Sequence, residues 1–127
     1  MITLAIIPAR GGSKRIVRKN VRTFFGAPML AHPLRAAAAS GIFDEIHVST
    51  NDPEIASVAR AEGFAPRFAR EDALSDDMTP IRTVVHNAML AHNTEGIQVD
   101  TVALIYATAA LLEPNDIITA HDAFLDD

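Results

Sequence analysis

The sequence contains no cysteine, so neither a disulfide framework nor a thiolate metal site can form. It also lacks an apolar run that approaches the roughly 20 residues of a membrane-spanning helix. A secretory signal peptide is not indicated, because Arg10 interrupts the apolar opening of the chain. These absences predict a soluble, cytoplasmic protein with no membrane partner.

Carboxylates are missing from the first third of the chain. Residues 1–43 hold seven of the eleven lysine and arginine residues and no acid, although the 127-residue chain has a formal charge of −5. Both lysines fall in one short stretch, PARGGSKRIVRKN at 8–20. A basic loop on an acidic protein suits a discrete anionic ligand, whereas a nucleic-acid backbone favours a broad basic face. We therefore expect no nucleic-acid partner.

Apolar runs and helix-start signals alternate along the chain. They predict a buried strand at 2–7, further strands at 45–50, 64–68 and 101–107, and a short extended piece at 21–25. Helices are predicted at 28–40, 53–63, from 80 to about 91, and from 113 to the end. Pro33 is expected to delay or kink the first helix, which Gly41 closes. Pro66 predicts that the strand at 64–68 is short or at an edge, and the strand at 101–107 is expected to be fully buried.

Strands that alternate with helices of this length form parallel β-α-β units. We predict an α/β fold in which residues 1–127 form a single three-layer α/β/α domain with a mainly parallel, Rossmann-like sheet. Ligands of such sheets bind outside the carboxyl ends of the strands. The loops after the strands at 2–7 and 101–107, and the acidic loop at 69–79, are therefore the candidate site.

The basic stretch begins directly after the first predicted strand. Gly11 and Gly12 lack a Cβ, so their backbone N–H groups can approach an anion closely. Arg10 can donate two parallel hydrogen bonds to a phosphate, while Lys14 and Lys19 act as movable point charges. The combination predicts a polyphosphate cradle; the alternative is a solvated basic loop without a ligand.

Other common site types fit less well. A P-loop needs a glycine at a set distance before the lysine and a Ser or Thr after it, which Lys14 lacks. A dinucleotide-binding fingerprint needs a third glycine where Arg15 stands. A flavodoxin-like receiver domain would end its first strand in acids, where this chain has Arg10.

The stretch IPARGGSKRIVRKN at 7–20 resembles the signature of the acylneuraminate cytidylyltransferase family, which activates nine-carbon keto-sugar acids as CMP derivatives. The order of four further stretches agrees: FGAPML at 25–30, GIFDEIHVSTND at 41–52, REDALSDD at 70–77 and IYATAALL at 105–112. The resemblance implies a single nucleotide-binding domain of the nucleotide-diphospho-sugar transferase type. Tyr106-Ala107-Thr108-Ala109 is similar to the branch that uses pseudaminic acid rather than N-acylneuraminic acid. Val17 and Ala110 replace prolines that are usual in the family.

The resemblance implies that Arg10 and Lys19 act in catalysis and that a set of residues binds CTP. That set is Arg10, Gly11, Gly12, Ser13, Lys14, Lys19, Asn20, Arg70, Thr79 and Tyr106. Four of these have a structural alternative. Asn20 suits a turn and Thr79 a helix cap. Arg70 has Glu71, Asp72 and Asp76 as possible ion-pair partners, and Tyr106 suits a partly buried core position.

No metal site is predicted within the chain. Asp76 and Asp77 are adjacent and point in different directions, so a cap or solvated position is favoured. His86 and His92 are six residues apart, on different helix faces, and all five histidines are interpreted as structural or surface residues.

The chemistry implied by the resemblance is attack of the sugar's anomeric hydroxyl on the α-phosphate of CTP, with Mg²⁺ as the family's cofactor. The partners implied are CTP and a nine-carbon keto-sugar acid. The family's Asp-x-Asp metal pair and most of its dimerisation segment lie beyond the region that these 127 residues resemble. The sequence thus looks truncated, with the ligands of Mg²⁺ absent and a homodimer uncertain. The alternative function is a nucleotide-binding module without efficient catalysis.

Overall fold

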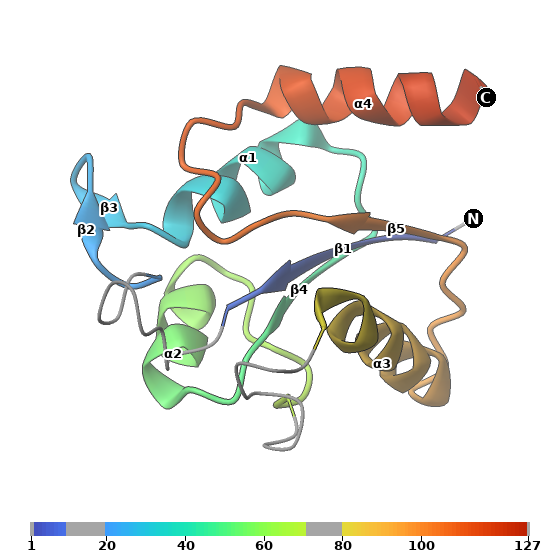
Figure 1. Ribbon diagram of the computed structural model, residues 1–127, viewed down its shortest axis with the longest axis horizontal. Helices are drawn as coiled ribbons and strands as arrows, with labels where there is room; N and C mark the ends of the chain where they lie inside the picture. Colours follow the sequence, from blue (N-terminus) through green and yellow to red (C-terminus); the bar gives the residue numbers. More distant parts are fainter. Residues whose placement is uncertain (1, 10–19, 71–79, 127) are drawn as a thin grey trace.

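The computed structural model describes residues 2–9, 20–70 and 80–126 (Figure 1). Within these ranges the central sheet consists of the strands β1 (Thr3–Pro8), β4 (Glu45–Ser49) and β5 (Thr101–Leu104). A small antiparallel hairpin is formed by β2 (Thr23–Phe24) and β3 (Ala27–Pro28). The helices are α1 (Ala31–Ser40), α2 (Pro53–Ala61), α3 (Ile81–Thr94) and α4 (Pro114–Asp126). None of these described helices is long and apolar enough to span a membrane.

Strand β1 lies in the middle of the sheet, with β4 on one side and β5 on the other. Both pairings are parallel, and Ile6 is the register partner of His47 on β4 and of Leu104 on β5. The stretch from Leu4 to Ile7 is fully buried, as expected for a strand that is covered on both faces. The predicted buried first strand and parallel sheet are confirmed.

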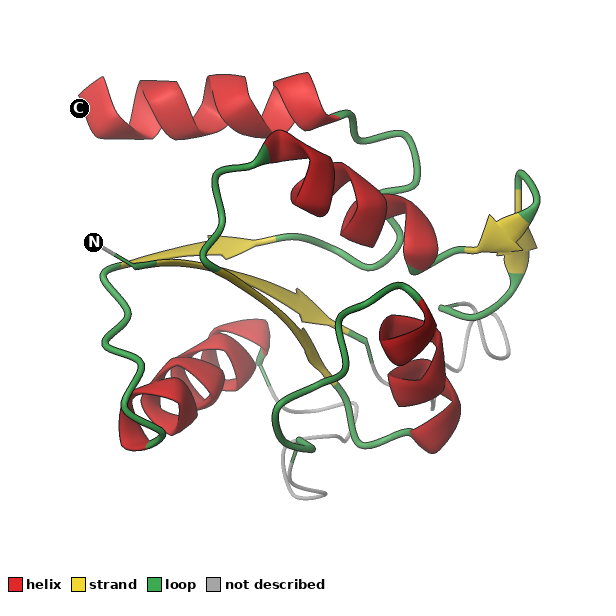
Figure 2. Cartoon of the chain, turned by 180° about the vertical axis from the view of Figure 1, so that it is seen from behind, coloured by secondary structure: helices red, strands yellow, loops and turns green. Residues whose placement is uncertain are grey.

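Helices cover both faces of the sheet. In Figure 1, α1 and α4 lie above the sheet and α3 lies below it, and Figure 2 shows the same layers from behind. Ala5 and Ile7 of β1 join the upper core, whereas Leu4 and Ile6 pack with Ala88 of α3. The upper core's helix residues are Leu34, Ala36 and Ala37 of α1, Ile55 and Ala59 of α2, and Ile117 of α4. Because alternate strand residues point to opposite faces, one apolar strand supplies both cores, and the predicted three layers are confirmed.

The helix boundaries follow local chemistry. Helix α2 begins after Asp52, whose carboxylate accepts hydrogen bonds from the backbone of Glu54 and Ile55, with Pro53 at the first helical position. Helix α1 begins at Ala31, later than the predicted start at residue 28. Pro33 is its third residue, where a backbone N–H has no acceptor within the helix, so the proline is tolerated. The helix ends at Gly41, whose φ of 72° is left-handed, as predicted.

Two strand predictions are wrong. Residues 64–68 form no strand, since Pro66 offers no N–H for pairing and the Phe68 side chain packs on the rings of His47 and His92 instead. Strand β5 ends at Leu104 rather than residue 107 and is not fully buried: Leu104 is 38% exposed. Among the described strands, β5 pairs only with β1. An apolar run can therefore belong to a strand at the edge of the described sheet. The extended piece predicted at 21–25 is reduced to β2.

Candidate functional site

The carboxyl ends of the parallel strands form the candidate site. The backbone N–H of Ala9, which follows β1, donates to the carbonyl oxygen of Ser49 at the end of β4 at 2.9 Å. The N–H of Ile105, which follows β5, donates to the carbonyl oxygen of Ile6 at 3.0 Å. The chain therefore leaves β1 and β5 at the same edge of the sheet, which is where ligands of parallel α/β sheets bind.

Most of the predicted phosphate-binding residues lie outside the described ranges. They are Arg10, Gly11, Gly12, Ser13, Lys14, Lys19 and Thr79. Val17 and the carboxylates Glu71, Asp72, Asp76 and Asp77 also lie outside these ranges. The polyphosphate cradle, its placement beside the 106–110 loop, the cap role of Thr79 and an ion pair of Arg70 with these acids all stay predictions. The described residues Asn20, Arg70 and Tyr106 are the ones whose positions can be stated.

Asn20 is buried, at 5% exposure, and is the last residue of the predicted basic loop. Its carbonyl oxygen accepts a hydrogen bond from the backbone N–H of Leu30 at 3.0 Å, and the residue lies in a turn. This backbone bond ties the end of the basic loop to the start of α1. The position agrees with the turn interpretation of Asn20 and leaves its role toward a nucleotide a prediction.

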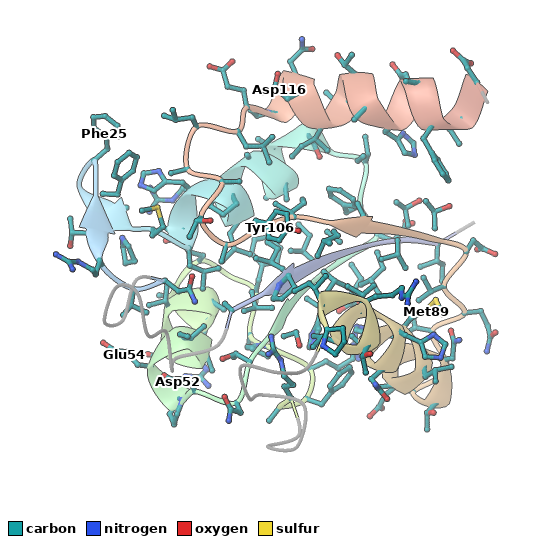
Figure 3. The ribbon with its side chains drawn as sticks, viewed as in Figure 1. Phe25, Asp52, Glu54, Met89, Tyr106 and Asp116 are labelled. Carbon is teal, nitrogen blue, oxygen red and sulfur yellow. The ribbon has the colours of Figure 1, made fainter. Side chains whose placement is uncertain are left out.

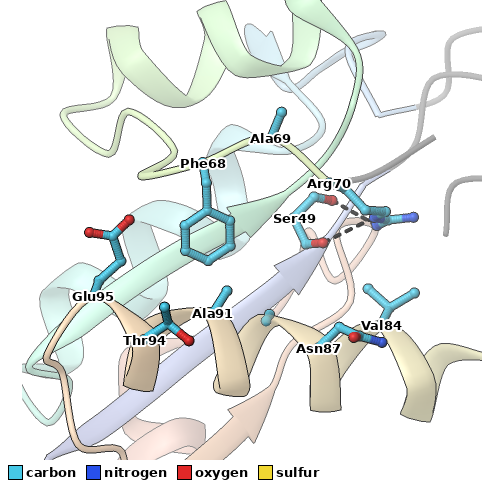
Figure 4. Close-up of a pocket in the computed structure, with 10 residues that line it drawn as sticks. Ser49, Phe68, Ala69, Arg70, Val84, Asn87, Ala91, Thr94 and Glu95 are labelled. Carbon is cyan, nitrogen blue, oxygen red and sulfur yellow. Dashed lines mark hydrogen bonds between the residues drawn. The ribbon is translucent and has the colours of Figure 1, made fainter. Parts of the chain in front are cut away.

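Arg70 lies beside the end of β4. Its Nε donates to the Oγ of Ser49 at 3.0 Å and its Nη2 donates to the carbonyl oxygen of Ser49 at 2.7 Å (Figure 4). Its backbone N–H donates to the carbonyl oxygen of Thr50 at 2.8 Å. A cationic side chain is thereby held at the carboxyl edge of the sheet, the position that a nucleotide-binding role requires.

Arg70 and Ser49 line a pocket of about 360 Å³. The opposite wall is helix α3, with Val84, Asn87 and Ala91, and the remaining wall includes Phe68 (Figure 4). The pocket combines a guanidinium and an amide with apolar side chains. That mixture suits a ligand that carries both a polar edge and an apolar face.

Tyr106 follows β5 and is 58% exposed (Figure 3). The alternative interpretation, a partly buried core tyrosine, is therefore wrong, because β5 is shorter and more open than its apolar sequence suggested. The loop after it is closed by two backbone hydrogen bonds, from Ala109 to Tyr106 at 3.0 Å and from Ala110 to Thr108 at 2.8 Å. The proline that the family resemblance implies at position 110 would have no N–H for the second bond.

Tyr106 also lines an apolar pocket of about 420 Å³ between β5 and α4. Val102 and Leu104 contribute from the strand, and Ile117 and Phe124 from the helix. This surface is largely apolar, so it offers few groups for recognition of a charged sugar or nucleotide.

A buried aromatic cluster under the first pocket escaped the sequence analysis. The ring of His47 on β4 lies against Phe68 and His92, with centroid separations of 4.5 and 5.0 Å. Nδ1 of His92 donates to the carbonyl oxygen of Ala88 at 2.7 Å, whereas neither ring nitrogen of His47 has a hydrogen-bond partner in the described chain. Burial, followed by the nearby His92, Arg67 and Arg70, lowers the pKa of His47 to about 3.

A family model described as cytidylyltransferase matches residues 4–127. The chain belongs to the cytidylyltransferase family. This confirms the family that the motif at 7–20 predicted. A pseudaminic acid cytidylyltransferase of Campylobacter jejuni is 44% identical over 125 residues, which are 98% of this chain and 54% of that protein. A CMP-N,N'-diacetyllegionaminic acid synthase of Legionella pneumophila is 35% identical over 117 residues, which are 92% of this chain and 50% of that protein.

This cytidylyltransferase-family chain spans about half the length of the curated relatives it matches. The solved structure of a CMP:2-keto-3-deoxy-manno-octonic acid synthetase complexed with CTP has a TM-score of 0.79 at 23% identity, over 100% of this chain and 48% of that one. A cytidylyltransferase from Leptospira borgpetersenii gives 0.76 at 20% identity, over 100% and 50%. At these identities the likeness shows the fold alone, and it confirms the α/β, Rossmann-like class.

Proposed function

We propose that this chain supplies the CTP-binding half of a cytidylyltransferase that transfers CMP from CTP to a nonulosonic acid and releases pyrophosphate. The observation that carries the proposal is the 44% identity to a pseudaminic acid cytidylyltransferase over 98% of the chain. The stretch YATA at 106–109 favours pseudaminic acid over N-acylneuraminic acid as the acceptor.

The proposed roles follow from charge and position. Arg10, Lys14 and Lys19 neutralise the triphosphate, and the backbone N–H groups around Gly11 and Gly12 donate to its oxygens. Arg70 contacts the nucleoside from the end of β4. The anomeric hydroxyl of the sugar acid attacks the α-phosphorus and loses its proton to solvent as a new P–O bond forms. The bond between the α-phosphorus and the oxygen that bridges it to the β-phosphate breaks, and pyrophosphate leaves.

Mg²⁺ is the cofactor that the family resemblance implies. Within residues 2–9, 20–70 and 80–126, no group of three histidine or carboxylate side chains is placed to hold a metal ion. The described residues therefore do not fit a metal site of their own, and we assign no step of the reaction to a metal held by them. A cytoplasmic location and the absence of nucleic-acid and membrane partners belong to the same proposal, and a homodimer stays an open alternative to a monomer.

A second candidate function is nucleotide binding without efficient turnover. It concerns a polypeptide of residues 1–127 tested by itself, which matches 54% of the Campylobacter jejuni enzyme. Phosphoryl transfer depends on positioning and charge neutralisation, and residues 1–127 lack the family's Asp-x-Asp pair. The polypeptide of residues 1–127 by itself is thus expected to bind CTP and to transfer CMP poorly.

A pyrophosphate-release assay separates the two functions. Residues 1–127 alone, and residues 1–127 fused to the distal half of the Campylobacter jejuni relative, would be incubated with CTP, Mg²⁺ and either pseudaminic acid or N-acetylneuraminic acid. We expect poor turnover by the chain alone and CMP-sugar formation by the fusion, with pseudaminic acid preferred. Robust turnover by residues 1–127 alone would overturn the binding-only function, and an inactive but folded fusion would overturn the transferase function.

A further inference from the structure

Arg70 makes three hydrogen bonds to two consecutive residues at the end of β4. Two go to Ser49, from Nε to the side-chain Oγ at 3.0 Å and from Nη2 to the carbonyl oxygen at 2.7 Å. The third runs from the Arg70 backbone N–H to the carbonyl oxygen of Thr50 at 2.8 Å. Figure 4 shows the two contacts with Ser49 on one edge of the pocket.

We propose that Ser49 is a positioning residue for nucleotide binding, which orients the Arg70 guanidinium through its hydroxyl and ties it to the start of the basic loop through its carbonyl. The inference rests on the proposed function, in which Arg70 contacts the nucleoside of CTP.

The carbonyl oxygen of Ser49 is shared. It accepts the N–H of Ala9 at 2.9 Å as well as the Nη2 of Arg70, and a carbonyl oxygen has two lone pairs for this purpose. Ala9 is the residue immediately before Arg10. One backbone atom therefore joins the Arg70 side chain to the chain segment that enters the basic loop.

The hydroxyl of Ser49 determines the rotation of the guanidinium. The five N–H groups of arginine lie in one rigid plane, so two contacts with a single residue set the direction of all of them. Ser49 is 3% exposed and is the last residue of β4, where its register partner is Pro8 of β1, so its own position is held by strand pairing. An arginine ordered before the ligand arrives loses less conformational entropy on binding than a freely rotating one.

A conservative substitution exists for this position. Ser49 lines the pocket of about 360 Å³, and Ser49→Thr keeps the hydroxyl at this position. Ser40 offers a matched control, since it is also buried and its Oγ donates to a carbonyl oxygen, that of Ala37 in α1, away from the strand ends.

The test is a double-mutant cycle measured as CTP affinity by titration calorimetry on residues 1–127. The variants are Ser49→Ala, Arg70→Ala, the pair combined, Ser49→Thr and Ser40→Ala. We expect Ser49→Ala to weaken CTP binding about fivefold and Arg70→Ala about tenfold or more, as expected for lost hydrogen bonds to neutral and charged groups. The double variant should bind no more weakly than Arg70→Ala, because Ser49 acts through Arg70. Ser49→Thr should restore the affinity, and Ser40→Ala should leave it unchanged.

Each outcome has one consequence. If the unaltered chain does not bind CTP, the proposed function fails and the inference falls with it. If the unaltered chain binds CTP and Ser49→Ala binds equally well, the proposed function stands and Ser49 has no positioning role. Two further results would overturn the inference. One is a loss of CTP affinity in the double variant that equals the sum of the single losses, and the other is a loss in Ser49→Thr as large as in Ser49→Ala. Either result would indicate a structural effect that does not act through Arg70.

Discussion

The rings of His47 and His92 meet edge to face, with centroids 5.0 Å apart and an interplanar angle of 81°. Both residues are buried, one on β4 and the other near the end of α3, and Phe68 lies against both. The contact joins the sheet to the helix that covers its lower face. It also places the ring of His47 where neither nitrogen has a hydrogen-bond partner in the described chain.

The first prediction is a loss of stability in acid through His47. Its pKa is lowered to about 3 in the folded protein, primarily by burial, while the unfolded chain takes up the proton near the ordinary value of 6.5. The unfolded state therefore binds more protons as the pH falls below 6.5, and stability declines toward pH 3. The slope for one such group is about 1.4 kcal/mol per pH unit. Urea unfolding at pH 7, 6 and 5 measures it.

The variant that isolates this effect is His47→Leu, which removes the titratable ring from the buried position. Its free energy of unfolding should fall less steeply between pH 7 and 5 than that of the unaltered chain. His86 is exposed on the same helix as His92, so His86→Gln is the matched control and should keep the steep slope. An unaltered pH dependence in His47→Leu would rule out His47 as its source.

The second prediction concerns the start of α2. The Oδ1 atom of Asp52 accepts hydrogen bonds from the backbone N–H groups of Glu54 at 2.9 Å and Ile55 at 3.2 Å. Asp52→Ala should lower the free energy of unfolding by about 1 kcal/mol, because two helix N–H groups lose their acceptor. Asp52→Asn should retain most of it. Asp122→Ala, at an exposed position within α4, is the control, and an equal loss there would argue against a capping effect.

The third prediction concerns residue 110, where this chain has alanine and the family resemblance implies a proline. The Ala110 N–H donates to the carbonyl oxygen of Thr108 at 2.8 Å. Ala110→Pro removes this bond, which contributes about 0.5–1.5 kcal/mol to the free energy of unfolding. The proline also restricts the unfolded chain, which adds about 0.4–1 kcal/mol to the same quantity. Thermal unfolding should therefore show no increase in stability. Ala110→Ser keeps the N–H and should match the unaltered chain, whereas a clearly more stable Ala110→Pro would show that the bond contributes little.

Local patterns in the sequence predicted the features that depend on neighbouring residues. The apolar run of β1 and the cap at Asp52 have signals within a few residues. The layers follow from the alternation of strand and helix signals along the chain. The strand predicted at 64–68 failed because the same apolar residues can pack by side chain alone, as Phe68 does on His47. The contact of His47 with His92 joins residues 45 positions apart in sequence, and the bonds of Arg70 with Ser49 span 21 positions. Such pairs arise from the packing of α3 and of the segment after α2 on the sheet, which periodicity does not encode.

The most direct test of the account is CTP binding to residues 1–127 by titration calorimetry, in the unaltered chain and in Arg10→Ala and Lys19→Ala. We predict a single CTP site and a loss of about tenfold or more in each variant, because charge-assisted phosphate contacts contribute about 1.5–3 kcal/mol. The control is Arg67→Ala, whose side chain pairs with Glu45 at the opposite end of β4 and should be dispensable. Two results would contradict the claim that the basic loop at 10–20 is a nucleotide site. One is failure of the unaltered chain to bind CTP, and the other is a CTP affinity in Arg10→Ala and Lys19→Ala that equals that of the unaltered chain.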